Sequence, residues 1–281
     1  MFRFYAPCAL AVRLVAGVAV AVLACSEGGG AAAKLKLHEA VEAENLLQVR
    51  ALLAEGGHLD ARDAEGRAPL HVAAELGLWP IQLELLAAGA DVMVRTAEGQ
   101  TPLHLAAPGD SSVRSLLLLL EHGASPRARD DQGRTPLHGD LSGPTMRLLL
   151  GRGGDPQARD HEGRTPLHVV ASFARGGAMI VLTEAGADVT LTDNAGRTPL
   201  HYSVVHPSSR LAMVLMAKGI DLDHQDETGE TPLHVAARAG IRRIVLQLVD
   251  AGANRSLPDS AGRTPLQVAV EAGKEMNAKA L

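Results

Sequence analysis

The chain has 281 residues, of which 46% are apolar and only 2% aromatic, and its formal net charge at pH 7 is −5. This apolar content is sufficient for a sizeable core, and a core with few aromatic side chains is typical of helices rich in Ala and Leu. The negative charge argues against a nucleic-acid-binding protein, which needs a basic surface to neutralise phosphates. Cys8 and Cys25 are the only cysteines, too few for a disulfide framework.

Residues 1–24 are predicted to be a signal peptide. Arg3 and Arg13 are the only charged residues before Glu27, and residues 14–24 (LVAGVAVAVLA) are all apolar or glycine. A positive start followed by a short apolar run is typical of export signals, whereas a membrane-spanning helix needs about 20 apolar residues. The alternatives are an ordinary secretory signal with an incidental cysteine and an apolar helix buried in a protein that is not exported.

The residues VLA directly before Cys25 resemble the cleavage site of bacterial lipoproteins. This resemblance implies that Cys25 is lipidated and becomes the new N-terminus, and that residues 25–34 form a flexible tether. It also implies an exported, membrane-anchored protein that faces the periplasm or the cell surface. Ser26 is not an acidic inner-membrane retention residue, so the outer membrane is slightly favoured. Cleavage would remove Cys8 and leave no thiol with which Cys25 could form a disulfide or a metal site.

A period of about 33 residues runs through the rest of the chain. The tetrapeptide TPLH begins at positions 101, 135, 165, 198 and 231, APLH begins at 68 and TPLQ begins at 264. The period and the tetrapeptide together resemble the ankyrin repeat over residues 35–281. The resemblance implies an all-α repeat solenoid, in which pairs of helices are joined by β-hairpin fingers.

Each repeat contains the signals for two helices. The threonine of the tetrapeptide is a good N-cap, since its hydroxyl can accept a hydrogen bond from a free backbone amide, and proline suits the first helical position. A second helix follows, as in residues 241–251, where apolar residues form one stripe, and a glycine ends it. An Asp-x-x-Gly turn such as Asp130–Gly133 then leads to the next repeat.

We expect about eight repeats. An N-terminal cap repeat spans residues 35–62, six repeats span 63–258, and a truncated cap repeat spans 259–281, because the outer faces of terminal repeats contact water. The repeat that begins at Thr135 is three residues short and contains Gly139, Gly143 and Pro144. Because Gly and Pro weaken helices, we predict that this repeat is the weakest step of the array, a bend or a hinge.

The histidines of the tetrapeptides are predicted to be structural: His71, His104, His138, His168, His201 and His234. The resemblance implies that each imidazole bridges the turn backbone to the neighbouring repeat. One histidine per repeat is too dispersed for a shared metal site. The chain also lacks the sequence motifs of metalloproteases, serine hydrolases and phosphate-binding loops, so we expect no catalytic residue, metal, cofactor or small-molecule substrate.

The residues expected to bind a partner lie mainly directly before the tetrapeptide, and His161 lies at a finger tip. The first group is Arg67, Gln100, Arg134, Arg164, Arg197, Glu230 and Arg263, and a second file of arginines precedes the turns at Arg62, Arg95, Arg129 and Arg159. Two interpretations are open. The arginines could anchor an acidic partner, since Arg is enriched at interfaces, or they could form ordinary surface ion pairs with nearby Asp and Glu.

Trp79, the single tryptophan, aligns with a Leu-like position before the second helix, so we expect it to pack in the core rather than form an exposed hot spot.

These features together predict a non-enzymatic protein-binding module or scaffold, tethered to the bacterial cell envelope. It would bind another protein through a concave face of fingers and first helices. The alternative is a regulator or inhibitor of a specific envelope or secreted enzyme. The two functions predict the same sequence, since the difference lies in the partner.

Overall fold

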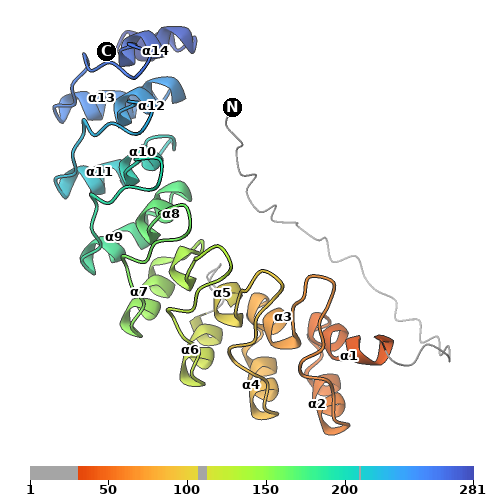
Figure 1. The fold of residues 1–281 in the computed structure, drawn as a ribbon. Coiled ribbons are helices and arrows are strands. Elements are labelled where there is room, and N and C mark those ends of the chain that lie inside the picture. Colours follow the sequence, from red (N-terminus) through yellow and green to blue (C-terminus); the bar gives the residue numbers. More distant parts are fainter. Residues whose placement is uncertain (1–30, 107–112, 209) are drawn as a thin grey trace.

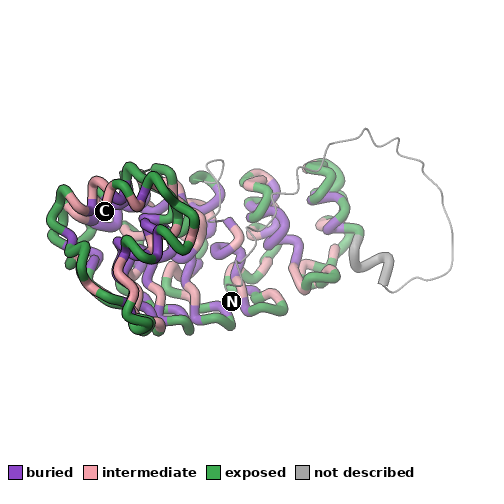
Figure 2. Tube along the Cα trace, turned by 90° about the horizontal axis from the view of Figure 1, so that it is seen from above, coloured by how far each residue is buried: buried purple, intermediate pink, exposed green. Residues whose placement is uncertain are grey.

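The computed structural model describes residues 31–106, 113–208 and 210–281. The predicted signal peptide and Cys25 lie outside these residues. Within them the chain forms successive pairs of short helices that stack into a curved solenoid (Figure 1). Figure 2 shows buried residues concentrated along the interior of the stack, while the joining loops are largely exposed. No helix in the described part of the chain combines the length and the apolar character that crossing a membrane requires.

The first helix of each pair lies on the inner side of the arc (Figure 1). These helices are α1 (Ala31–Glu42), α3 (Pro69–Glu75), α5 (Pro102–Ala106), the 3-10 helix η2 (Pro136–His138), α8 (Pro166–Ser172), α10 (Pro199–Ser203), α12 (Pro232–Ala239) and α14 (Pro265–Glu271). From α3 onwards each begins at the proline of the tetrapeptide, where the missing amide costs no helical hydrogen bond.

The second helix of each pair lies on the outer side of the arc (Figure 1). These helices are α2 (Leu46–Ala54), α4 (Trp79–Ala87), α6 (Val113–Glu121), α7 (Gly143–Gly151), α9 (Gly176–Glu184), α11 (Arg210–Ala217), α13 (Arg242–Asp250) and α15 (Glu275–Ala278). The tether predicted over residues 25–34 is wrong at its C-terminal end, because α1 begins at Ala31. The run AAAK consists of strong helix formers and extends the helix towards the N-terminus.

The core is a single column between the two helix layers. The leucine of the tetrapeptide occupies this column in each of the inner repeats, and its side chain is no more than 1% exposed: Leu70, Leu103, Leu137, Leu167, Leu200 and Leu233. The corresponding Leu266 is 41% exposed, since α14 packs against a described helix pair on one side only. Burial of this leucine therefore depends on the following repeat.

The fingers contain no strand in the described residues, so the β-hairpins implied by the resemblance are reduced to tight turns. In one finger the Asp130 amide donates to the Arg134 carbonyl (2.9 Å) and the Gly133 amide donates to the Asp130 carbonyl (3.0 Å). One such cross-pair is too short for a ladder. Gly133 has φ of 73°, a conformation that glycine adopts without strain.

The expectation that Trp79 packs in the core is wrong. Its side chain is 41% exposed at the start of α4, and the guanidinium carbon of Arg114 lies 5.8 Å from the ring centroid. Ile81 and Leu85, both at most 3% exposed, fill the core beneath this helix instead. The tryptophan ring is therefore an outer-face residue covered in part by an arginine.

The short repeat has the shortest first helix of the described pairs. This is the three-residue η2, and Leu141 is fully buried at a position where α3, α8 and α12 are still helical. Helices α7 and α9 lie close together. A Cβ atom placed on Gly143 would lie only 3.4 Å from the backbone of Gly177. The direction of the array changes at this level (Figure 1).

We predict that amide hydrogen exchange is fastest in residues 138–146 of the array interior. A three-residue 3-10 helix contributes few protecting hydrogen bonds, and local opening there breaks the fewest contacts. The measurement compares this segment with its counterparts 168–176 and 234–242 in the same protein. Uniform protection of all three segments would contradict a weak step at this repeat.

Candidate functional site

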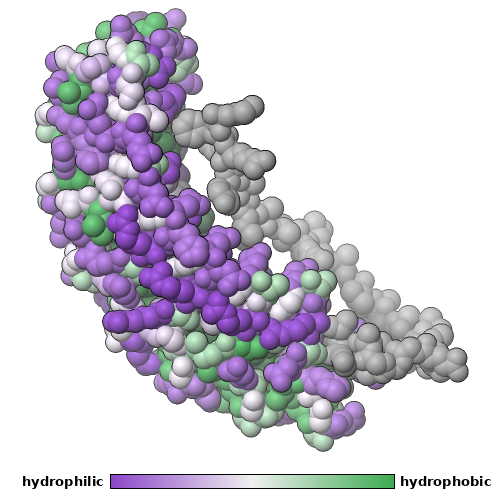
Figure 3. Space-filling model, viewed as in Figure 1, coloured by the Kyte–Doolittle hydropathy of each residue, from purple (hydrophilic) through white to green (hydrophobic). Residues whose placement is uncertain are grey.

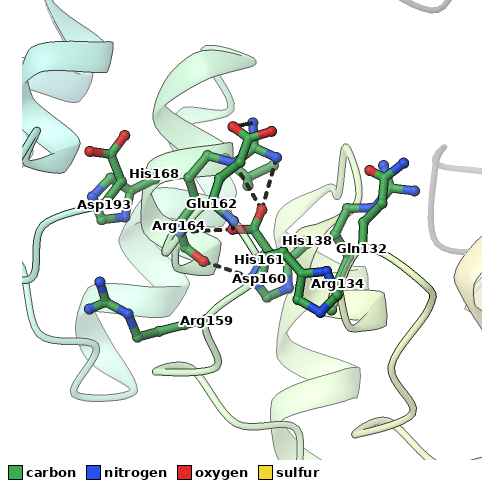
Figure 4. A network of polar contacts seen from close by, with 12 residues as sticks. Gln132, Arg134, His138, Arg159, Asp160, His161, Glu162, Arg164, His168 and Asp193 are labelled. Atoms are coloured by element: carbon green, nitrogen blue, oxygen red, sulfur yellow. Dashed lines mark hydrogen bonds and ion pairs between the residues drawn. The ribbon is translucent and has the colours of Figure 1, made fainter. Parts of the chain in front are cut away.

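Each motif histidine connects its own repeat to the next one. His168 is fully buried, and the backbone amide of Thr165 donates to its Nδ1 (3.1 Å). Its Nε2 lies 3.0 Å from the carbonyl oxygen of Arg197, one repeat further along. A carbonyl only accepts hydrogen bonds, so Nε2 carries the proton and Nδ1 is left as the acceptor. The imidazole is neutral in this arrangement, and Figure 4 shows His138 and His168 in successive repeats.

The same bridge recurs along the array. The other pairs of imidazole Nε2 and carbonyl oxygen are His38 with Arg67 (2.8 Å), His71 with Gln100 (3.0 Å), His104 with Arg134 (3.1 Å), His138 with Arg164 (3.1 Å), His201 with Glu230 (3.1 Å) and His234 with Arg263 (3.0 Å). The position predicted to bind a partner thus has its backbone carbonyl committed to the preceding repeat, and only its side chain faces outward.

The threonine caps differ from the expectation. The Thr165 hydroxyl lies 2.9 Å from Nδ1 of His168, to which it donates, and it makes no cap bond to the helix. The hydroxyls of Thr231 and Thr264 do accept from the amide three residues later. In most repeats the imidazole therefore caps the threonine amide. In the last repeat Gln267 replaces the histidine, and its Oε1 accepts from the Thr264 amide at 2.8 Å.

Burial makes the histidines poor bases. It lowers the pKa of His71 and of His168 to about 4, although the hydrogen bond to the next carbonyl acts in the opposite direction. Burial likewise lowers the pKa values of His104, His138 and His201. Protonation of Nδ1 would also place an N–H donor opposite the threonine amide, where the amide needs an acceptor.

The arginines before the tetrapeptide are fixed by an aspartate four residues earlier. In one finger Nε of Arg164 donates to Oδ2 of Asp160 (2.8 Å), while Oδ1 accepts from the amides of Glu162 (3.0 Å) and Arg164 (2.8 Å), as Figure 4 shows. The Asp160 side chain is 1% exposed and that of Arg164 is 24% exposed. The finger hides its carboxylate and leaves the guanidinium at the surface.

Four other fingers contain the same pair: Asp63 with Arg67, Asp130 with Arg134, Asp193 with Arg197 and Asp259 with Arg263. These arginines therefore form ion pairs with nearby aspartates, as the second interpretation of the sequence predicts. Because the arginines remain partly exposed, the pairing leaves them able to contact a partner.

Comparison with known families identifies the architecture. A model of ankyrin repeats in three copies matches residues 140–226 and 206–281, and a model of ankyrin repeats in many copies matches residues 52–106 and 85–139. The chain belongs to the ankyrin repeat family. No curated protein matches it. Ankyrin repeats mediate protein–protein interaction and are typically non-enzymatic, and nothing in the described ankyrin array indicates catalysis.

The second file of arginines joins ankyrin fingers to one another. Nη1 of Arg129 donates to the carbonyl of Gly133 in its own finger and to the carbonyl of Arg159 in the next (2.7 Å each). Gln225 reproduces both bonds with its amide, at 2.8 Å, to Gly229 and Pro258. Arg62 and Arg159 likewise donate to backbone carbonyls of the next finger, whereas Arg95 pairs with the Asp131 carboxylate at 3.1 Å. This second file is therefore not equivalent to the first.

Three predicted site residues depart from the Arg–Asp pattern. Four residues before Gln100 the finger has Thr96 in place of an aspartate. The Thr96 hydroxyl accepts a hydrogen bond from the Gln100 amide at 3.2 Å. Glu230 pairs with Arg238, the distance from Nη2 to Oε2 being 2.7 Å. His161 is exposed at a finger tip, and its amide donates to the carbonyl of Gln132 on the preceding finger (2.9 Å). The predicted residues therefore form one row along the fingers, with His161 beside it.

Sequence reasoning missed Tyr202. Its hydroxyl donates to Oδ2 of Asp193 (2.6 Å), and the guanidinium carbon of Arg197 lies 4.8 Å from the ring centroid. Burial raises the pKa of Asp193, but the hydrogen bonds from Tyr202 and Arg197 outweigh this effect and hold the pKa below its ordinary value. The signal was available, because Tyr202 is the only aromatic residue directly after a tetrapeptide.

In the described residues no group of three or more His, Cys, Asp or Glu side chains could hold a metal ion.

We predict that the free energy of unfolding decreases as the pH falls from about 6.5 towards 4. The unfolded chain takes up protons at the ordinary histidine pKa of 6.5, whereas folded His71 and His168 resist protonation until about pH 4. The contribution is present in full above about pH 6.5 and is lost on acidification. Urea unfolding at a series of pH values measures it.

The variant His168→Gln should weaken this pH dependence and lower the stability at pH 7.5 by about 1–3 kcal/mol, the cost of an unsatisfied buried carbonyl. As at Gln267, the amide can still cap the threonine, but it loses the bridge to Arg197. His122→Gln is the control, because His122 is exposed. An unchanged pH slope in His168→Gln would show that the bridge does not control the titration.

Proposed function

We propose that this ankyrin array is a non-enzymatic protein-binding module or scaffold of a bacterial cell envelope. The observation that supports it most is the continuous inner face, where the first helices of successive pairs lie side by side (Figure 1). The histidine bridges hold this face in register from His38 to Arg263. An array of this length can supply about 800 Å² to a partner, the area of a standard interface.

The proposed anchor is a lipid on Cys25, which the apolar run of residues 14–24 and the following glycines support. Acyl chains add about 0.8 kcal/mol of membrane affinity for each buried methylene group, so lipidation would hold the array at a membrane. The tether between Cys25 and α1, which begins at Ala31, is short. The face that binds the partner would consequently stay near that membrane, on the periplasmic or the cell-surface side.

We predict that the wild-type protein fractionates with membranes and that Cys25→Ser fractionates with soluble proteins. Metabolic labelling with a palmitate analogue should mark the wild type and leave Cys25→Ser unlabelled. Cys8→Ser is the matched control, since Cys8 would be removed with the signal, and it should behave as the wild type. A Cys25→Ser protein that stays in the membrane fraction would refute the anchor.

Binding can be tested in cells with a photo-crosslinking residue placed on either side of the array. Position Ser172 is exposed at the end of α8, on the inner side, and position Arg147 is 73% exposed on α7, on the outer side. We predict a discrete crosslinked protein from position 172 and none from position 147. The absence of any adduct from position 172 would argue for a structural spacer.

A further inference from the structure

Three consecutive repeats expose arginines whose acidic partners are hidden. The side chains of Arg134, Arg164 and Arg197 are 30%, 24% and 33% exposed, whereas the aspartates that pair with them are each 1% exposed. Each aspartate also accepts hydrogen bonds from two backbone amides. A partner approaching the fingers therefore meets the positive end of each pair. Figure 3 shows a strongly hydrophilic band over the loops in the middle of the array.

The outer repeats neutralise the same position with a residue eight positions later. Nη1 of Arg67 lies 2.7 Å from Oε2 of Glu75, and Nη1 of Arg263 lies 3.2 Å from Oε2 of Glu271. These glutamates are 47% and 59% exposed, so the negative charge is also at the surface. At Glu230 the charges of the pair are reversed. The acid stands before the tetrapeptide, and the arginine that pairs with it, Arg238, stands eight residues later.

The central repeats lack this second partner. Ser172 stands eight residues after Arg164 and Val205 stands eight residues after Arg197. The short repeat places Ser142, the N-cap of α7, eight residues after Arg134. Among these three arginines, Arg164 also faces the exposed Glu162, whose Oε2 lies 3.2 Å from Nη1, and Arg197 interacts electrostatically with Asp226 on the next finger.

Tyr202 adds an aromatic ring to this row, and the guanidinium carbon of Arg197 lies 4.8 Å from the centroid of that ring. Arginine and tyrosine are, with tryptophan, the residue types enriched in binding hot spots. The pair is half-buried and fixed in place by Asp193, so little side-chain entropy is lost when a partner binds.

We propose that Arg134, Arg164 and Arg197 bind a segment of a partner protein in polyproline conformation that carries Asp or Glu at every third residue. This inference rests on the proposed protein-binding function and names the partner's chemistry. Packed helices are separated by about 8–10 Å, which sets the step between successive arginines. A polyproline helix has three residues per turn and rises about 3.1 Å per residue, so every third side chain lies on one face at about 9 Å intervals.

A nucleic acid fits this surface less well. The adjacent finger tips carry acidic residues, including Asp131 and Glu162, which are 61% and 51% exposed. A phosphate backbone would pass close to these carboxylates, whereas a peptide with spaced acids and neutral intervening residues would contact only the arginines.

The first test uses labelled peptides and the purified wild-type protein. The peptide EPPEPPEPP presents its acids at every third residue, and EEEPPPPPP has the same composition with the acids clustered. We expect the spaced peptide to bind at least about tenfold more tightly, and its binding to weaken as salt is raised from about 50 to about 300 mM. Equal binding of the two peptides, or tighter binding of a single-stranded RNA of similar charge, would overturn the inference.

The second test neutralises the row without removing an arginine. The double variant Ser172→Glu/Val205→Glu copies the arrangement of Arg67 and Glu75 and should weaken binding of the spaced peptide about fivefold or more. The control Arg147→Glu changes the net charge by the same amount on the outer side of the array and should bind as the wild type does. A double variant that binds normally overturns the inference. If crosslinking at position 172 succeeds while the peptide fails, the binding function stands and this inference alone is wrong.

Discussion

The hydrogen bond from each buried imidazole to the backbone carbonyl of the next repeat is the interaction on which the array depends. The fingers contain no strand in the described residues, and several first helices are only five residues long or shorter. The polar bonds between neighbouring repeats therefore come from this buried bridge and from single bonds between fingers, such as the one from Arg129 to the carbonyl of Arg159. The stability of a repeat array is roughly the sum of repeat and neighbour terms. A repeated bridge, together with the buried leucine beside it, therefore sets the strength of each step.

Because of this bridge, the residue before the tetrapeptide uses its backbone for stability and leaves its side chain for recognition. The residue before the tetrapeptide gives its carbonyl to the histidine of the preceding repeat, and this requirement does not depend on the side chain. The side chain is free to vary, as Arg134, Gln100 and Glu230 show. The array can thus keep a constant scaffold while the outward charges change from repeat to repeat. In the central repeats this freedom produces exposed arginines whose carboxylate partners are buried.

Much of this fold is predictable from the sequence, because the period is strong. The helix pairs, the buried leucines such as Leu167 and the prolines at the helix starts follow from local propensity and spacing. The reversed cap at Thr165 is not predictable, since hydroxyl and imidazole can each accept or donate. The exposure of Trp79 depends on how α4 is rotated on the core, which one-dimensional alignment does not give. Pairs eight residues apart, such as Arg67 and Glu75, need the finger and the helix to fold back together.

Nitrogen-15 NMR of the imidazole side chains tests the central claim most directly, because it reports protonation at each ring nitrogen. At pH 6 the bridge requires His71 and His168 to be neutral, with the proton on Nε2 and Nδ1 acting as an acceptor. This follows from their pKa values of about 4 and from the carbonyl opposite Nε2. Imidazolium signals at pH 6, or protons on Nδ1, would contradict the account.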